Sequence, residues 1–157
     1  MRGGNARADH ETRVHESDHH SLKLWLRLLT CSSLIERKLR DKLRRSFDIT
    51  LPRFDFLAQL ERSPNGLTMG QLSERMMVSG GNISGIAAQL VNEGLVSRSP
   101  LPNNRRTFLV TLTRKGRKKF RMIANAHEAW IVEILGQIKK DDVRQLMELL
   151  NKVKTQV

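Results

Sequence analysis

The sequence predicts a mainly α-helical fold with one small β-ribbon, and three observations support this prediction. Apolar residues recur at helical spacing through most of the chain after residue 21. Between residues 107 and 112 one set, Phe108, Val110 and Leu112, instead alternates as in a half-buried strand. The 157 residues, of which 39% are hydrophobic, are enough for one domain with a single core.

Residues 1–20 contain almost no apolar side chain, and we expect them to form a disordered tail. The tail contains His10, His15, His19 and His20, which lack the fixed spacing of a structural metal site, so we interpret them as solvated. The net charge of the chain is +12, yet residues 1–21 carry three basic and four acidic residues. The positive excess therefore lies in the folded part and predicts attraction to a polyanion, either nucleic acid or anionic lipid.

Other sequence features narrow the class of protein. No apolar run approaches the roughly 20 residues that cross a bilayer, and the polar start lacks the apolar stretch of a secretory signal. The single cysteine, Cys31, excludes an internal disulfide and fits a reducing compartment, so we expect a cytoplasmic protein. The chain has no phosphate-binding glycine loop, paired-carboxylate arrangement, zinc-protease motif or nucleophile–base pair. We therefore expect no enzyme activity, no cofactor and no metal.

A long first helix is predicted over residues 22–47. Two mainly apolar stripes are shifted around the helix relative to each other: Leu22, Trp25, Leu26 and Leu29, then Leu28, Ser32, Ile35, Leu39 and Leu43. At 1.5 Å per residue the helix would be roughly 39 Å long, which exceeds the width of a domain of this size. We therefore expect a second chain to cover the part that projects.

Two shorter helices are predicted to follow. The first begins at residue 50 or 51, has Pro52 in its first turn, where the missing N–H donor is harmless, and ends in a turn at 63–66. Its inward side consists of Phe54, Leu57 and Leu60. The second spans 68–76, where Thr68 and Gln71 have the spacing of a capping box. Its apolar side, Met69, Leu72 and Met76, is expected to join the core.

A further helix is predicted over residues 79–93, with Ser79 as its N-cap and Gly94 as a left-handed end. Its inward stripe is Ile83, Ile86, Ala87 and Leu90, and its opposite face carries Gly81, Asn82, Gly85, Ala88, Gln89 and Asn92. Small residues allow close approach to a DNA groove, and amides can pair with adenine. The face predicts DNA reading; the alternative is an exposed helix weakened by its glycines, each costing roughly 1 kcal/mol.

A two-stranded ribbon is predicted next, with strands at 95–98 and 105–112 and a tip at 99–104. Arg105 and Arg106 would lie near the tip, where guanidinium groups can enter a minor groove. From Leu95 to Arg121 the chain has nine Lys or Arg residues and no acid. The predicted DNA-contacting residues are Ser79, Gly81, Asn82, Ser84, Gly85, Gln89, Arg98, Arg105 and Arg106.

Two last helices complete the prediction. Thr113 can cap a helix over 114–138, whose stripe runs Phe120, Ile123, His127, Trp130, Ile131, Ile134 and Ile138. Six Lys and Arg residues between 114 and 121 lie at the N-terminal end of this helix, where their positive charge opposes the helix dipole. This unfavourable arrangement favours a phosphate partner. Asp141 can cap the final helix. Together the elements predict a tail at 1–20, a winged helix-turn-helix DNA-binding domain at 51–113, and dimerisation helices at 21–50 and 114–157.

Five stretches carry a family resemblance: 51–55 (LPRFD), 66–73 (GLTMGQLS), 78–85 (VSGGNISG), 93–96 (EGLV) and 112–116 (LTRKG). In this order and spacing, over roughly residues 22–153, the chain resembles the MarR family of bacterial winged-helix transcriptional regulators. The resemblance implies a two-fold homodimer built from the first and last helices. It also implies a pseudo-palindromic operator with half-sites about one helical turn, roughly 34 Å, apart.

The resemblance further implies repression of a nearby operon and release by a small aromatic acid, or by its coenzyme A thioester, as in regulators of aromatic-compound breakdown. The candidate ligand-binding residues on the helices that the family uses are Trp25, Arg40, Arg44 and His127, although a Trp or His in an apolar stripe more often belongs to a core. Arg37, Arg40, Arg44 and Arg45 would suit a phosphate-bearing thioester. The inducer, the operator and the direction of regulation are left open.

The sequence also departs from the family at one position and leaves two alternatives. Family ribbons commonly carry an aspartate that orients an arginine at the tip, whereas this chain has Asn104 before Arg105 and Arg106. Some relatives sense peroxide with a first-helix cysteine activated by tyrosines; this chain has no tyrosine, so we expect Cys31 to be an inert, packed thiol. A nonspecific nucleic-acid-binding protein is the other alternative, because charge alone would serve it.

Overall fold

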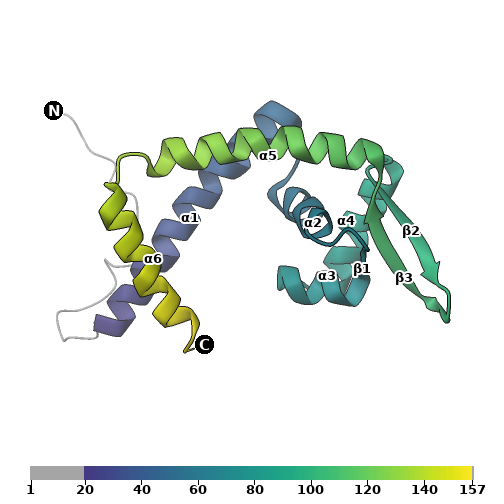
Figure 1. Cartoon of the computed structure of the whole chain (residues 1–157), viewed down its shortest axis with the longest axis horizontal. Helices are drawn as coiled ribbons and strands as arrows, with labels where there is room; N and C mark the ends of the chain where they lie inside the picture. Colours follow the sequence, from purple (N-terminus) through teal and green to yellow (C-terminus); the bar gives the residue numbers. More distant parts are fainter. Residues whose placement is uncertain (1–19, 157) are drawn as a thin grey trace.

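The computed structural model describes residues 20–156, and the predicted tail, apart from His20, lies outside them. Within this range the chain forms long and short helices and one small sheet, which lies at one end of the molecule (Figure 1). The elements are α1 (His20–Phe47), α2 (Leu51–Glu61), β1 (Leu67–Thr68), α3 (Met69–Met76), α4 (Gly80–Asn92), β2 (Val96–Leu101), β3 (Asn104–Leu112), α5 (Arg114–Leu135) and α6 (Lys140–Lys154). The predicted mainly α-helical fold with a small β-ribbon is confirmed.

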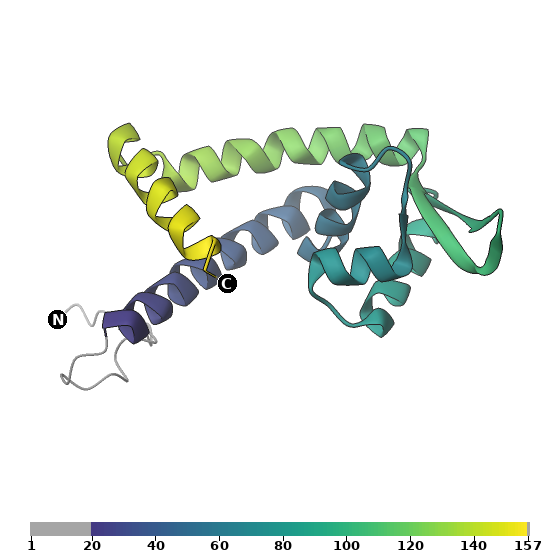
Figure 2. The same cartoon turned by 60° about the horizontal axis from the view of Figure 1, so that its bottom comes forward.

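The helices and the sheet are arranged in two lobes. Helices α2 to α4 and the sheet gather at one end, while α1, α5 and α6 extend away from them as an open frame (Figures 1 and 2). The helices α1 and α5 connect the two lobes, and Phe47 at the end of α1 meets Trp130 of α5 with 6.1 Å between ring centroids. The elements predicted to read DNA therefore lie at the ends of two long helices.

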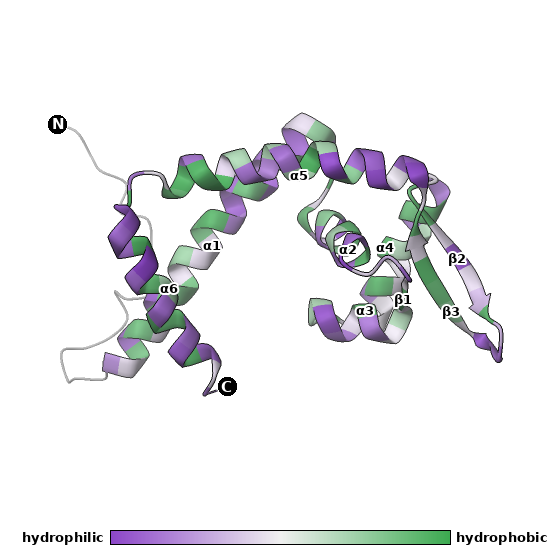
Figure 3. Ribbon diagram, viewed as in Figure 1, coloured by the Kyte–Doolittle hydropathy of each residue, from purple (hydrophilic) through white to green (hydrophobic). Residues whose placement is uncertain are grey.

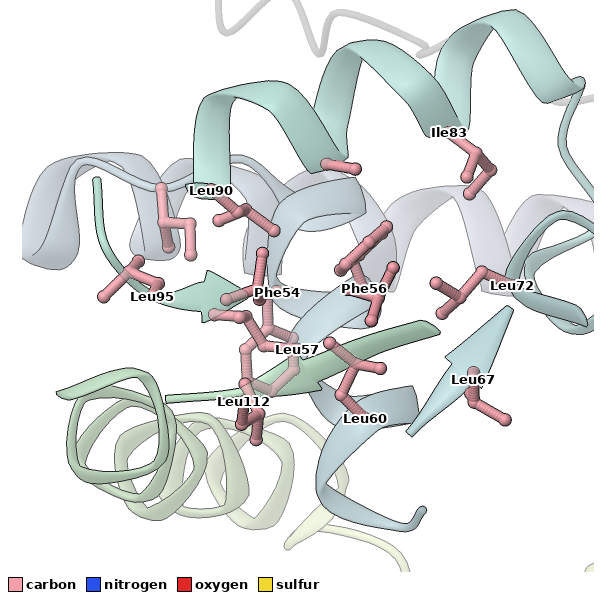
Figure 4. Close-up of a cluster of buried hydrophobic side chains, with 14 of the residues drawn as sticks. Phe54, Phe56, Leu57, Leu60, Leu67, Leu72, Ile83, Leu90, Leu95 and Leu112 are labelled. Carbon is pink, nitrogen blue, oxygen red and sulfur yellow. The ribbon is translucent and has the colours of Figure 1, made fainter. Parts of the chain in front are cut away.

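One hydrophobic core holds the compact lobe together. Figure 4 shows side chains from α2, α3, α4 and the sheet converging on Phe54, Phe56 and Leu57 of α2. Ile83, Ala87 and Leu90 of the predicted α4 stripe are fully buried, and Ile86 is half-buried. Because these apolar residues recur at i, i+4 and i+7, one side of α4 is fixed inward and the other side is turned to solvent.

The sheet has three strands, in the order β1-β3-β2, rather than the predicted two. The two-residue strand β1 pairs antiparallel with β3 through Leu67 and Val110. The ribbon tip is also shorter than predicted, because β2 continues to Leu101 and β3 starts at Asn104. Pro100 lies within β2, which is an edge strand, the position in a sheet where proline is usually found.

Several helix ends differ from the prediction. Thr68 forms the expected capping box with Gln71, but Ser79 occupies the N-cap position of α4 without a side-chain hydrogen bond. The helix α5 ends at Leu135, not at residue 138. The N-cap of α6 is Lys139, so the prediction that Asp141 caps this helix was wrong. Asp141 lies in the first turn instead, where its negative charge still favours the positive end of the helix dipole.

The basic start of α5 is partly neutralised within the protein. Arg117 donates to the carboxylate of Glu61 at 2.8 Å, and Arg121 lies 3.5 Å from the same side chain. Lys115 donates to the main-chain carbonyl oxygen of Glu93, at the end of α4. Thr113 caps α5 as predicted by accepting from the Gly116 N–H at 2.9 Å. Acceptors within the protein therefore contact three of the six basic residues, so a phosphate partner, which the sequence favours, is not required to explain these three.

Candidate nucleic-acid interface

The exposed face of α4 consists of small and amide side chains. Gly81, Asn82, Ser84, Gly85 and Gln89 are all exposed, as is the capping position Ser79. A Cβ atom added at Gly80, Gly81 or Gly85 would meet nothing within 4 Å. The outward orientation predicted for this face is therefore confirmed. The backbone of the first turn of α4 can approach another surface closely, with free N–H groups at its end.

The end of α4 is held in place by several contacts. Gly94 adopts a left-handed φ of 69°, and the Leu95 N–H donates to the Leu90 carbonyl at 2.9 Å, which closes the helix. The side chain of Glu93 accepts from Arg53 of α2, while its main-chain carbonyl accepts from Lys115 of α5 at 2.8 Å. Contacts from α2 and α5 therefore fix the C-terminal end of α4, whereas its N-terminal end is exposed to solvent.

The β2–β3 ribbon, which we call the wing, carries exposed arginines beside α4. Arg105 and Arg106 lie at the start of β3 and are both exposed. The Arg98 guanidinium stacks 4.6 Å from the centre of the Phe108 ring, so part of its surface is occupied within the wing. The side-chain oxygen of Asn104 accepts a hydrogen bond from the Arg106 main-chain N–H at 3.1 Å. The amide thus fixes the backbone at the tip without pairing with a guanidinium group.

A cavity of about 520 Å³ lies between α2, α3 and α5. Phe54 stacks on Phe120 with 5.6 Å between ring centroids, and on His127 with 4.7 Å. Arg62 and Arg75 supply positive charge at the lining, and Asp55 supplies a carboxylate. Burial lowers the pKa of His127, which favours its neutral form. Although Asp55 reaches solvent, loss of surrounding water and the nearby Glu36 raise its pKa, against the opposing effect of Arg62.

The four sequence-predicted ligand residues do not share one site. His127 lines the 520 Å³ cavity, whereas Arg40 and Arg44 line a smaller hollow of about 280 Å³ beside Pro52. Trp25 lies far along α1 and is 57% exposed. The sequence reasoning missed Asp55 of α2, Arg62 at the C-cap of the same helix and Arg75 of α3, because single charged residues on helix surfaces give no local signal. Only the fold brings them together.

Two further expectations concern reactive groups. Cys31 is exposed in the described chain, beside Leu34, Ile35 and Leu135, so the expectation of a packed thiol was wrong for a single chain. Among residues 20–156 no group of His, Cys, Asp and Glu side chains is arranged to hold a metal ion. No helix in the same range is both long and apolar enough to span a membrane.

Comparisons with known proteins agree on one family. The model described as the MarR family matches residues 47–107. The transcriptional activatory protein BadR of Rhodopseudomonas palustris is 28% identical over 134 residues, which cover 83% of this chain and 76% of the relative. A MarR family transcriptional regulator from Silicibacter pomeroyi superposes with a TM-score of 0.77 at 27% identity, covering 91% of this chain and 99% of that structure. Wild-type MarR from E. coli gives 0.72 at 28% identity, covering 81% and 94%.

The matched segment 47–107 contains α2, α3, α4 and most of the wing, the elements that carry the exposed amide face and the arginines. The structural likeness extends beyond it to the long helices, since the superpositions cover most of the chain. Family model, fold and the arrangement of the surface are mutually consistent: residues 47–107 match the MarR family, and the chain as a whole is similar in sequence and fold to transcriptional regulators of that family.

Proposed function

We propose that this regulator binds a pseudo-palindromic operator as a homodimer, represses transcription there and is released by a small aromatic acid. The observation that carries the proposal is the exposed face of α4, where open space at Gly81 and Gly85 adjoins the amides of Asn82 and Gln89. A helix of this kind fits the major groove, and the wing arginines Arg98, Arg105 and Arg106 would contact the backbone or the adjacent minor groove.

The homodimer is supported by apolar surface that the single chain leaves uncovered. No residue of α6 is buried, and its apolar stripe includes Leu146, Met147, Leu150 and Val153. The first half of α1 likewise exposes Leu22, Leu24 and Trp25. Figure 3 shows hydrophobic positions along both helices. Covering this surface with a second copy would place two α4 helices on one DNA duplex, in the two-fold arrangement that a pseudo-palindrome requires.

An aromatic acid is supported by the chemistry of the 520 Å³ cavity. Phe54, Phe120 and the neutral imidazole of His127 form an aromatic wall, while Arg62 and Arg75 can receive a carboxylate. The cavity touches the last residue of α3, Met76, and also Val78 in the turn before α4. A bound ligand could therefore favour one orientation of the two α4 helices and their wings over another. The coupling free energy between ligand binding and DNA binding is typically 1–3 kcal/mol.

A coenzyme A thioester of such an acid is a second candidate, favoured by one feature. Pro52 lines both the aromatic cavity and the smaller hollow that contains Arg40 and Arg44. An acyl group in the first and phosphate groups at the second would use both. Isothermal titration of the free acid and its thioester compares the two ligands directly. Equal affinities would reject the thioester, and a loss of thioester affinity alone in Arg44→Ala would support it.

A footprint on the DNA that flanks the gene tests operator binding. The proposal expects a short, symmetric protected site that resists competition by unrelated DNA, and release when the inducing acid is added. Protection that disappears with modest salt and follows no sequence would indicate a nonspecific nucleic-acid-binding protein instead. In vitro transcription from the same promoter tests the direction of regulation. Repression is expected, and increased transcript would align the chain with the activatory relative from Rhodopseudomonas palustris.

A further inference from the structure

Met77 combines two unfavourable features in the turn between α3 and α4. Its side chain is 93% exposed, more than any other large hydrophobic residue within 20–156. Its backbone adopts a left-handed conformation with φ of 53°, a region that favours glycine or asparagine. A strained backbone and an exposed thioether both disfavour methionine at this position, and no residue among 20–156 covers the side chain in return.

Hydrogen bonds fix the backbone of the surrounding turn on both sides of Met77. The Met77 N–H donates to the Glu74 carbonyl at 3.2 Å, and the Ser73 hydroxyl donates to the Val78 carbonyl at 2.6 Å. The flanking Met76 and Val78 are half-buried and line the 520 Å³ cavity. The turn therefore anchors its two neighbours inward and presents Met77 alone to solvent.

The position of Met77 is next to the open end of α4. Val78 separates it from Ser79, and the exposed face begins immediately afterwards with Gly80, Gly81 and Asn82. If the first turn of α4 enters a groove, Met77 reaches the DNA at the edge of the same surface. A long, unbranched and polarisable side chain can adapt to an irregular apolar contact there.

Resting on the proposed DNA-reading role of α4, we propose that Met77 is a DNA-contacting residue. Its thioether side chain packs against apolar carbon of the operator, either a thymine 5-methyl group or deoxyribose carbon. The contact removes the side chain from water only in the complex, so its benefit is realised on binding. In the free protein Met77 has both an unfavourable backbone conformation and an exposed apolar side chain. In the DNA complex the side chain is buried, so only the cost of the backbone conformation remains.

The substitution Met77→Gly separates this role from simple strain. Glycine suits the left-handed φ, so the variant is expected to melt at a higher temperature than the wild type. Its operator affinity is nevertheless expected to fall about tenfold, the loss typical of one base-pair contact. Met77→Leu, which keeps an apolar side chain, is expected to bind within about twofold of the wild type. Met122→Ala serves as the control, because Met122 is an exposed methionine on α5.

Operator DNA with uracil in place of thymine distinguishes the two apolar sources. If the wild type loses affinity on uracil DNA and Met77→Gly does not respond, the contact is a thymine methyl. If neither responds while Met77→Gly remains weak, the contact is deoxyribose. Unchanged operator affinity in Met77→Gly overturns the inference, as does a loss that accompanies dissociation of the dimer in sedimentation. A wild type that protects no operator would instead reject the proposed function itself.

Discussion

At the scale of single residues, glycines in this chain meet two opposite requirements. A Cβ atom at Gly116, in the first turn of α5, would lie 1.8 Å from the carbonyl oxygen of Leu95. A Cβ atom at Gly85, in the middle of α4, would meet nothing within 4 Å. The first glycine lets the wing and α5 pack inside the protein, whereas the second leaves space on the outside, where only a partner molecule could need it.

Substituting the two glycines should therefore change stability in opposite directions. We expect Gly116→Ala to lower the free energy of unfolding by about 3 kcal/mol, the upper range for overpacking, because a main-chain oxygen cannot easily move aside. Gly85→Ala, the matched control, should raise it by up to about 1 kcal/mol through helix propensity. Urea denaturation followed by circular dichroism measures both. Equal effects of the two substitutions would contradict this interpretation.

His127 should make stability fall at mildly acidic pH. Burial lowers its pKa from the ordinary 6.5, so its contribution is fully present above pH 6.5 and is lost as the pH falls through the lower folded-state pKa. The raised pKa of Asp55 acts in the opposite sense, because acidification removes its unfavourable charge. Thermal melts between pH 7.5 and 5 should show a weaker pH dependence for His127→Phe than for the wild type, since phenylalanine retains the ring against Phe54. Parallel pH profiles would show that His127 contributes none of the slope.

At the scale of elements, the sequence predicts what local pattern encodes. The inward and outward faces of α4 follow from the 3.6-residue period of Ile83, Ala87 and Leu90, all of which are buried. The strand β1 escaped prediction because two residues show no periodicity, and its pairing with β3 depends on chain brought back from more than forty residues away. The end of α5 was placed too late because apolar residues continue to Ile138, beyond the turn at Gly136.

The candidate site divides along the same line. Every predicted DNA-contacting residue lies on α4, at its N-cap or on the wing, because these residues are contiguous in sequence. The aromatic cavity could not be predicted as a unit, because Asp55, Arg75 and His127 come from three helices that meet only in the folded chain. Arg40 and Arg44 share α1 with Trp25 and were therefore predicted to share a site with it. In the fold they line a small hollow that contains neither Trp25 nor His127.

The amides of α4 should contribute sequence-specific binding without affecting the fold. Asn82 and Gln89 are exposed and make no side-chain hydrogen bond within the described chain, so replacement by alanine should leave unfolding unchanged. Each replacement should weaken operator binding by roughly 1–3 kcal/mol and leave nonspecific DNA unaffected. Gel-shift titration with operator and scrambled duplexes at one salt concentration measures the difference. A uniform loss on both duplexes would mean that the amides contact only the backbone.

At the scale of the whole molecule, the two lobes depend on a second chain in different ways. The compact lobe has a closed core around Phe56, to which Leu43 of α1 and Ile123 of α5 also contribute. The helix α6 buries no residue in the described chain, although Leu146, Met147 and Leu150 lie on one side of it. Helices of this length with an uncovered apolar side gain most of their stability from packing. The arrangement is therefore incomplete as a single chain, and a partner would complete the long-helix lobe.

Leu150→Glu should accordingly break the dimer and, with it, operator binding. A carboxylate in an apolar interface must be desolvated without a partner, whereas on the single chain the 39% exposed position 150 would keep it in water. Sedimentation should show the mass of one chain, and Asn151→Asp, an exposed neighbour in α6, should remain dimeric. Operator affinity should fall by orders of magnitude, because each chain would then bind one half-site alone. In the dimer, binding of one α4 helix raises the effective concentration of the other at its half-site. Because the core of the compact lobe does not involve α6, circular dichroism should still show a folded protein.

A variant that stays dimeric would place the interface elsewhere, and a monomer with full operator affinity would show that one α4 helix and one wing suffice for recognition.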